Sequence, residues 1–437
     1  MTKVTDWEKA RRRHTSGIAH RRHEAAWLDE TDALREFRDA FIIAEADTIY
    51  LDGNSLGRLP KRTIARLQEI ISREWGEQLI RSWNSGWFEA PARIGGKIAK
   101  LIGAEPGEVI VGDSTSVNLF KLAMAALMAL PQRKVIVSDE LNFPSDLYIL
   151  QGCIELLGGE HTLHILKASD GLQVELDDLQ NAVEEKTALV TLSHVIFKSG
   201  AMYDMPAITE LAHRAGAMVL WDLSHSVGVV PIDLDAWGVD LAIGCTYKYL
   251  NGGPGAPAFL YVRKELQERF RSPIWGWFGQ QNPFAFDLDY QPTNGIQRFL
   301  IGTPPVLSLL ALDEALEITL QAGIPAIRKK SVRLTSFLIE LFDEHLAPLG
   351  FELGTPRQPE RRGSHISIRH PEGYRINQAL IEEMKVIPDF REPDNIRLGL
   401  APLYTSFSEV QEAIQRIRVV VEKRIYTHYS NQRHAVT

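Results

Sequence analysis

Short apolar runs alternate with helix-type patterns between residues 108 and 262, which predicts an α/β fold. The candidate strands lie at 108–111, 134–137, 188–192, 217–221, 241–243 and 258–262. Apolar residues at helical spacing fall between several of them, at 116–130, 175–184 and 206–215. Alternating strands and helices form a mostly parallel sheet with covered faces, and such a sheet binds ligands at the carboxyl ends of its strands.

The segments outside this region predict further parts of the molecule. Residues 1–45 are polar and charge-rich, and residues 61–80 have the apolar spacing of an amphipathic helix. Residues 263–300 form an aromatic loop region, residues 304–346 a helical region, and residues 350–425 a mixture of short strands and helices. We therefore expect three parts, an N-terminal arm, a large α/β domain and a smaller α+β domain against which the arm packs: 1–47, 48–305 and 306–437.

Composition and charge narrow the class of protein. The 437 residues carry a formal net charge of -8, which argues against a nucleic-acid or polybasic membrane role. Two cysteines, Cys153 and Cys245, provide neither a disulfide framework nor a metal cage. The N-terminus lacks an apolar signal region, and the apolar run 123–130 is far shorter than the roughly 20 residues of a membrane-spanning helix. We expect a cytoplasmic protein with no nucleic-acid or membrane partner.

Lys248 is the first candidate for chemistry. It lies between two tyrosines, directly after the apolar run 239–243 and directly before a glycine cluster. Lysine is rarely buried without a reason, and a desolvated lysine amine is a nucleophile suited to forming a Schiff base. The alternative is a solvated lysine beside a glycine-rich turn.

Polar and ionisable side chains follow the predicted strands, so we expect them at one edge of the sheet. Asp222 comes directly after one strand, where it is either a helix N-cap or a functional carboxylate. Together with Lys248 it matches the pyridoxal phosphate arrangement, in which a lysine holds the cofactor and a carboxylate pairs with the ring nitrogen. That pairing keeps the nitrogen protonated, so the ring can accept the electrons released when a substrate Cα bond breaks.

Two further features fit such a cofactor. Thr115 and Ser116 follow a strand and open a helix, where hydroxyl and free N–H groups make an anion site suited to a phosphate, although both residue types also cap ordinary helices. Phe143 follows another strand and is either a core residue or a stacking partner for the cofactor ring.

Larger motifs carry a family resemblance. Asp222 with His225, followed by Thr246-Tyr247-Lys248, resembles the class V aminotransferase group of fold-type I pyridoxal phosphate enzymes. Six further segments make the chain similar to the kynureninase family: 50–57, 81–84, 142–146, 244–255, 276–279 and 402–404. The similarity extends from about residue 48 to about residue 410.

The resemblance implies a role for each candidate residue. Lys248 would hold pyridoxal 5'-phosphate as a Schiff base and move the Cα proton, and Tyr247 would bind the cofactor and handle a later proton. The other cofactor-binding residues would be Thr115, Ser116, Phe143, Asp146, Ser193, Asp222, His225, Trp277 and Thr303. The substrate-binding residues would be Arg397, Trp83, Ser55 and Asn54. The planar fork of Arg397 would clamp the substrate α-carboxylate.

The resemblance also implies a homodimer, a reaction and a substrate preference. Trp277 and Thr303 would reach the cofactor phosphate of the other subunit. The reaction would be hydrolysis of L-kynurenine to anthranilate and L-alanine by Cβ–Cγ cleavage, a step of tryptophan catabolism. Animal-type members favour 3-hydroxykynurenine and carry His and Asn where this chain has Trp83 and Thr303. Because these two residues offer less to a ring hydroxyl, we expect weaker action on 3-hydroxykynurenine than on kynurenine.

Four other functions share some of these features. A cysteine desulfurase of the same fold group would need a reactive cysteine on a C-terminal loop, where neither cysteine lies. An aminotransferase stays open, because Arg397 serves either reaction. A non-catalytic pyridoxal-binding regulator would need an extra DNA-binding domain. We expect no metal, because the 13 histidines are scattered and the pair His161 and His164 lacks a third ligand.

Overall fold

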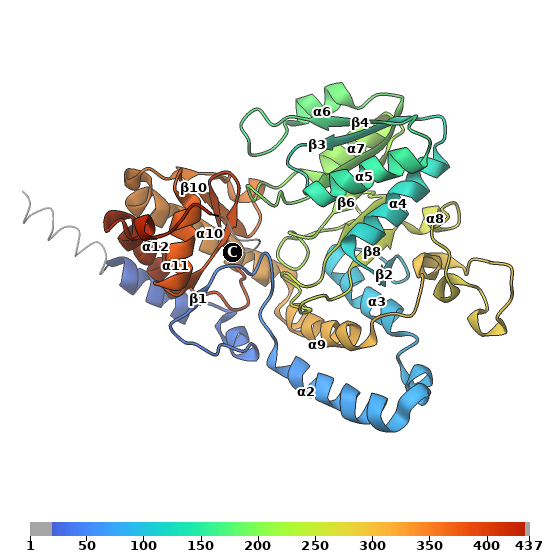
Figure 1. Cartoon of the computed structure of the whole chain (residues 1–437), viewed down its shortest axis with the longest axis horizontal. Coiled ribbons are helices and arrows are strands. Elements are labelled where there is room, and N and C mark those ends of the chain that lie inside the picture. The colour runs from blue at the N-terminus through green and yellow to red at the C-terminus, as the bar shows by residue number, and fades with distance from the viewer. Residues whose placement is uncertain (1–19, 433–437) are drawn as a thin grey trace, which may run out of the picture.

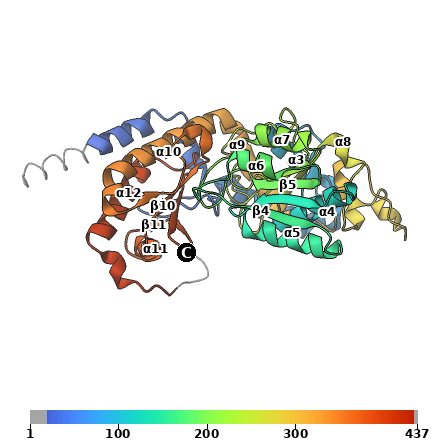
Figure 2. The same ribbon diagram turned by 90° about the horizontal axis from the view of Figure 1, so that it is seen from above.

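The computed structural model describes residues 20–432 and has two lobes, each built on its own β-sheet (Figure 1, Figure 2). The larger sheet has seven strands in the order β2-β8-β7-β6-β5-β3-β4, and β8 alone runs opposite to the other six. The strands are β2 (Val109–Val111), β3 (Val135–Asp139), β4 (Thr162–Leu166), β5 (Thr187–Ser193), β6 (Met218–Asp222), β7 (Leu241–Gly244) and β8 (Phe259–Val262).

Helices cover both faces of this sheet. One face packs against α3 (Ala90–Ile102), α6 (Leu176–Ala182), α7 (Met205–Arg214) and α9 (Val306–Ala322). The other face packs against α4 (Thr115–Ala129), α5 (Pro144–Leu156) and α8 (Lys264–Gln267). Val109 and Val111 of β2 lie in the first core and Ile110 lies in the second, because successive side chains of a strand point to opposite faces. Burial on both faces explains the continuous apolar runs of the sequence.

This sheet confirms the predicted fold class, and all six predicted strands occur within two residues of their expected bounds. The strand β4 was not predicted. It lies at the edge of the sheet, where its side chains are mostly exposed and its sequence is correspondingly less apolar. The helix predicted over 61–80 is α2 (Lys61–Glu69), which continues as a π-helix over Ile70–Gln78.

The second lobe contains a four-stranded antiparallel sheet in the order β12-β13-β10-β9. Its strands are β9 (Glu352–Leu353), β10 (His365–Arg369), β12 (Asp389–Arg391) and β13 (Asn395–Gly399). A separate parallel pair joins β1 (Ile49–Tyr50) to β11 (Val386–Ile387). The helices of this lobe are α10 (Ile324–His345), α11 (Gly373–Glu382) and α12 (Phe407–Glu422).

The described residues before β2 include a segment that packs with the second lobe. Arg21 forms ion pairs with Glu340 and Glu344 of α10, at 3.2 and 3.0 Å. Ile49 and Leu51 lie in the core of that lobe. The part of the predicted arm before residue 20 falls outside the described residues. The three-part domain division stays a prediction, and these contacts favour a first boundary a few residues after 47.

Candidate active site

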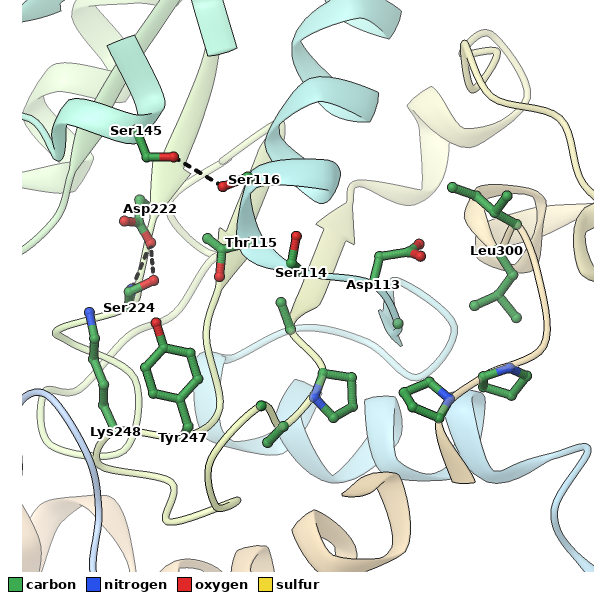
Figure 3. Close-up of a pocket in the computed structure, with 18 of the residues that line it drawn as sticks. Asp113, Ser114, Thr115, Ser116, Ser145, Asp222, Ser224, Tyr247, Lys248 and Leu300 are labelled. Carbon is green, nitrogen blue, oxygen red and sulfur yellow. Dashed lines mark hydrogen bonds between the residues drawn. The ribbon is translucent and has the colours of Figure 1, made fainter. Parts of the chain in front are cut away.

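A cavity of about 550 Å³ lies at the carboxyl ends of the parallel strands of the larger sheet. We call it the Lys248 cavity. Several of its lining residues are labelled in Figure 3. It brings together nine of the candidate residues: Thr115, Ser116, Phe143, Asp146, Asp222, His225, Tyr247, Lys248 and Thr303. The fold therefore gathers residues from five separate segments of the chain at one place, as the strand-end pattern predicted.

The start of α4 forms one wall of the cavity. Ser114 is the N-cap, and its side chain accepts a hydrogen bond from the Val117 amide at 3.3 Å. Thr115 and Ser116 occupy the first turn, and the Ser116 hydroxyl lies 3.0 Å from the Ser145 hydroxyl (Figure 3). A helix of 15 residues with hydroxyls at its N-terminus is a favourable place for a phosphate group, because its first N–H groups and its dipole attract negative charge.

Two buried carboxylates lie on the same side of the cavity. Asp222 ends β6, and one of its oxygens accepts hydrogen bonds from the Ser224 amide at 2.8 Å and the Ser224 hydroxyl at 2.5 Å. Burial raises the pKa of Asp222, while the charge of Lys248 opposes that shift. Burial and the nearby Asp222 raise the pKa of Asp146 well above its ordinary value. The second carboxyl oxygen of Asp146 is buried and has no hydrogen-bond partner within residues 20–432.

Lys248 follows β7 and is half-buried, which excludes the interpretation as a fully solvated lysine. Its Nζ lies 3.2 Å from Nε2 and 3.4 Å from Nδ1 of His225. Burial, followed by the positive charge of Lys248, lowers the pKa of His225 well below its ordinary value. The imidazole is therefore neutral at physiological pH, so it contacts the lysine amine without adding a second positive charge.

Tyr247 and Phe143 complete the cavity around Lys248. The neighbouring Cys245, followed by burial, raises the pKa of Tyr247, so its phenol keeps its proton at neutral pH. Phe143 is 42% exposed, and its ring meets Phe197 edge-on at 5.4 Å. The alternative interpretation of Phe143 as a core residue is therefore wrong, and the ring is free to stack on a planar group in the cavity.

Arg397 lies outside the Lys248 cavity, in a buried to half-buried polar group that we call the Arg397 cluster: Arg397, Asp389, Ser55 and Asp52. Its guanidinium forms an ion pair with Asp389, donates to the Ser55 hydroxyl at 3.0 Å and donates to the Phe197 carbonyl at 2.7 Å. Burial and the nearby Asp389 raise the pKa of Asp52 to about 7. The alternative of a surface arginine is wrong, because Arg397 is 1% exposed in β13.

Two buried histidines separate the Arg397 cluster from Lys248. His365 lies with its ring 5.7 Å from the ring of His225, which in turn contacts Lys248. Burial and the charge of Arg397 lower the pKa of His365 to about 3, so it is neutral. A lysine amine and a guanidinium thus lie on either side of a neutral histidine pair, which suits a substrate carrying an amino group near a carboxylate.

The remaining candidates do not line the Lys248 cavity. Ser193 is buried and donates to the Asn142 side chain at 2.7 Å. Asn54 is fully buried beside Gly399, and its side-chain amide has no partner within the described residues. Trp83 and Trp277 both pack on Phe278, with ring centroids 5.8 and 4.5 Å away.

Several site residues were not among the sequence candidates. Ser224 donates to Asp222, two residues before it, and Ser145 contacts Ser116 and directly precedes Asp146. Their closeness in the sequence to two candidate carboxylates was a usable signal. Asp389 and His365 sit in short strands of the second lobe, and nothing in the local pattern distinguishes them from structural residues.

The two cysteines do not belong to the site chemistry. Both are buried, and burial raises the pKa of each thiol, to about 12 for Cys153. Within residues 20–432, no cluster of three or more His, Cys, Asp or Glu side chains is arranged to hold a metal ion. Over the same residues, no helix has the length and apolar character needed to cross a membrane.

The residues of the Lys248 cavity fit pyridoxal phosphate. The start of α4 offers hydroxyl and amide groups for a phosphate, and the buried Asp222 offers a carboxylate for a ring nitrogen. Phe143 presents an exposed aromatic face, and Asp146 carries an oxygen without a partner. Lys248 supplies the amine.

Comparisons with known proteins agree with a pyridoxal phosphate site in the Lys248 cavity. A family model described as "Kynureninase C-terminal domain" matches residues 327–417, and one described as "DegT/DnrJ/EryC1/StrS aminotransferase family" matches residues 79–232. A kynureninase of Pseudomonas fluorescens is 45% identical over 422 residues, which is 95% of this chain and 99% of that protein. A kynureninase of Burkholderia pseudomallei strain 1106a is also 45% identical, over 92% of this chain and 95% of its own.

Solved structures agree on the fold. A cysteine desulfurase from Thermococcus onnurineus NA1 matches with a TM-score of 0.76 at 20% identity, covering 89% of this chain and 98% of its own. A cysteine desulfurase from Escherichia coli matches with a TM-score of 0.75 at 16% identity, over the same shares. At these identities the likeness concerns the fold alone. With a relative 45% identical over nearly its whole length, the chain belongs to the kynureninase family of fold-type I pyridoxal phosphate enzymes.

Proposed function

We propose that this enzyme hydrolyses L-kynurenine to anthranilate and L-alanine at the Lys248 cavity, as a step of tryptophan catabolism. The observation that carries the reaction class is one cavity that contains Lys248, the buried Asp222 and the hydroxyl-bearing start of α4. The choice of kynurenine follows from the relatives, which are kynureninases over nearly their full length.

The chain's own residues would hold the cofactor by its two ends. Thr115 and Ser116 would bind the phosphate, Asp222 would pair with the ring nitrogen, and Lys248 would hold the aldehyde carbon. Phe143 would stack on the ring, and the free oxygen of Asp146 would accept a hydrogen bond from a ring substituent. When bound, pyridoxal phosphate supplies an electron sink for the bonds at the substrate Cα.

Lys248 and Arg397 would move the substrate proton and orient the substrate, respectively. Once the substrate amine has taken its place, the Lys248 amine would remove the Cα proton. His225, 3.2 Å away, is neutral and therefore adds no positive charge that would oppose protonation of the amine. Arg397 would bind the substrate carboxylate. Since Asp389 now pairs with Arg397, the substrate must displace or share that carboxylate, and Ser55 bridges both groups.

Tyr247 is our candidate for the proton given back late in the cycle, because its pKa is raised and its phenol keeps its proton. We expect Tyr247→Phe to lower kcat by about a hundredfold or more through loss of one acid-base group. Exchange of the substrate Cα hydrogen in D₂O should continue, since Lys248 carries that step. The exposed Tyr148→Phe is the matched control. An unaltered cleavage rate in Tyr247→Phe would refute the role.

Trp83 and Thr303 support a preference for the unsubstituted substrate. An indole and a short hydroxyl give little compensation to a ring 3-hydroxyl that has lost its water. We expect kcat/KM for kynurenine to exceed that for 3-hydroxykynurenine, and Trp83→His to move the ratio toward the hydroxylated substrate. Steady-state kinetics on both substrates measure this preference. A wild-type kcat/KM for kynurenine lower than that for 3-hydroxykynurenine would contradict the proposed roles of Trp83 and Thr303.

A homodimer is supported by the aromatic surface around Trp277. Trp277, Phe284, Phe286 and Leu288 are all between 40 and 102% exposed. The rings of Trp277, Phe284 and Phe286 contact one another in turn, and such an exposed aromatic cluster favours burial against another subunit. Because Trp83 and Trp277 share Phe278, a Trp277 that reaches the partner's cofactor would bring Trp83 to the same site. Thr303 lines the cavity of its own chain, so its action across the interface rests on the family resemblance.

Mixing two inactive variants tests this arrangement. If Trp277 serves the other subunit, mixed dimers of Trp277→Ala and Lys248→Ala contain one intact site. We then expect about a quarter of the wild-type activity after mixing and re-equilibration, since half of the dimers are mixed and each regains one of two sites. Sedimentation equilibrium should give twice the chain mass. If the mixture of the two variants forms mixed dimers but recovers no activity, Trp277 serves the site of its own chain.

A further inference from the structure

A second cavity, of about 640 Å³, lies where the two lobes meet. We call it the Arg328 cavity. It shares no lining residue with the Lys248 cavity. One side comes from the helices α6 and α7, and the other from Arg328 of α10 and the segment around residue 360. Its walls are largely apolar: Leu179, Met202, Met205, Ile208, Val230 and Trp237.

Arg328 brings a positive charge into this cavity without a matching carboxylate. Its guanidinium donates to the backbone carbonyls of Pro359 at 2.6 Å, Arg362 at 3.0 Å and Gly363 at 3.5 Å. Within residues 20–432, it forms no ion pair with an Asp or Glu at 4 Å or less. Burial lowers the pKa of Arg328. A half-buried charge that has only carbonyl partners is costly, and an entering anion would relieve that cost.

The other polar groups of the cavity leave Arg328 available. His194 is buried against it, and burial followed by the charge of Arg328 lowers the pKa of His194 to about 3, so the imidazole is neutral. Of the carboxylates, Asp204 caps α7 by accepting from Ala207 at 3.1 Å. Glu175 pairs with Arg361 at 3.3 Å, and Glu360 is exposed. Of the remaining polar groups, the Tyr203 hydroxyl donates to Asp139 at 2.7 Å, and Gln173 is buried with an amide oxygen that has no partner within residues 20–432. The cavity therefore combines apolar side chains with the Arg328 guanidinium, which has no carboxylate partner in the described part of the chain, and a few neutral polar groups.

We propose that the Arg328 cavity is a second small-molecule site, which binds an organic monocarboxylate with an apolar, ring-sized body. The guanidinium fork would bind the carboxylate, and Trp237 with the methionine side chains would cover the ring. A backbone hydrogen bond links the two cavities, because the amide of His194, which lines the Arg328 cavity, donates to the carbonyl of Asp222, which lines the Lys248 cavity, at 2.9 Å. It does not depend on which substrate the Lys248 cavity accepts.

The experiment is calorimetric titration of 2-naphthoate into the cofactor-loaded protein. Arg328→Gln removes the charge, and we expect the dissociation constant to rise by about tenfold or more, the usual loss for a charged hydrogen-bond partner. Arg214→Gln, an exposed arginine at the end of α7, should bind as the wild type does.

A second pair of variants covers the case in which Arg328→Gln loosens the carbonyls that it holds. Leu176 lines the cavity at 42% exposure and begins α6, where Glu is favourable for the helix. Leu176→Glu should weaken binding by about tenfold through charge repulsion, whereas Leu176→Gln and the distant exposed Leu156→Glu should not. Absence of binding at millimolar probe, or equal affinity of Leu176→Glu and wild type, would overturn the proposal.

Discussion

Replacement of Lys248 with alanine is expected to lower kcat/KM for kynurenine by at least about a thousandfold. The change removes both the amine that holds the cofactor and the base that moves the Cα proton, and one positioned acid-base group alone is worth about a hundredfold to ten-thousandfold. Anthranilate fluorescence measures the rate, and the loss of the visible absorbance of the lysine-bound cofactor reports the first role separately.

The control for this variant is Lys100→Ala, which removes an exposed lysine from α3 and should leave both readouts unchanged. Added methylamine should restore part of the rate in Lys248→Ala, because a small amine can enter the space that the side chain leaves. A Lys248→Ala protein that cleaves kynurenine within tenfold of the wild type would contradict the assignment of Lys248 and leave the site without its nucleophile.

Replacement of Arg397 with glutamine should have two separable effects. Loss of the guanidinium removes the clamp on the substrate carboxylate, and we expect kcat/KM to fall by about a hundredfold, mainly through KM. It also removes one of the two ion pairs of Asp389, which is 1% exposed and keeps Arg391 at 2.8 Å, so we expect a loss of about 1–3 kcal/mol of folding free energy. Steady-state kinetics and urea unfolding measure the two effects.

The double variant Arg397→Gln with Asp389→Asn separates them. Removing both charges should restore part of the lost stability, since no buried carboxylate remains without Arg397 and the other partner of Asp389, Arg391, is 37% exposed. Activity should stay low, because the substrate carboxylate still lacks a cation. A double variant that regains both stability and activity would mean that Arg397 acts only as the structural partner of Asp389.

The sequence was informative wherever chemistry coincides with the end of a strand. Asp222, Lys248 and the Thr115-Ser116 pair each follow an apolar run, and parallel strands carry them to one edge. The strand pattern was clear because both faces of the larger sheet are buried. The edge strand β4 lacks that burial, so its sequence carries no such signal.

The second lobe was less predictable, for a physical reason. The Arg397 cluster joins Ser55, near the start of the described chain, to residues of β12 and β13 more than 300 positions later. No local pattern reports so distant a contact, and Asp389 is indistinguishable in the sequence from a surface carboxylate. Trp83 and Trp277 raise a similar difficulty, because the roles that we propose for them depend on a second subunit.

The most direct test of the proposed function is a product analysis without any keto acid. Cofactor-loaded protein is incubated with L-kynurenine alone, and anthranilate and alanine are quantified together. Hydrolysis predicts the two products in equal amounts over many turnovers, with none from the Lys248→Ala protein. Consumption of kynurenine that stops after about one turnover and resumes only when a keto acid is added would identify a transamination instead, and would contradict the account.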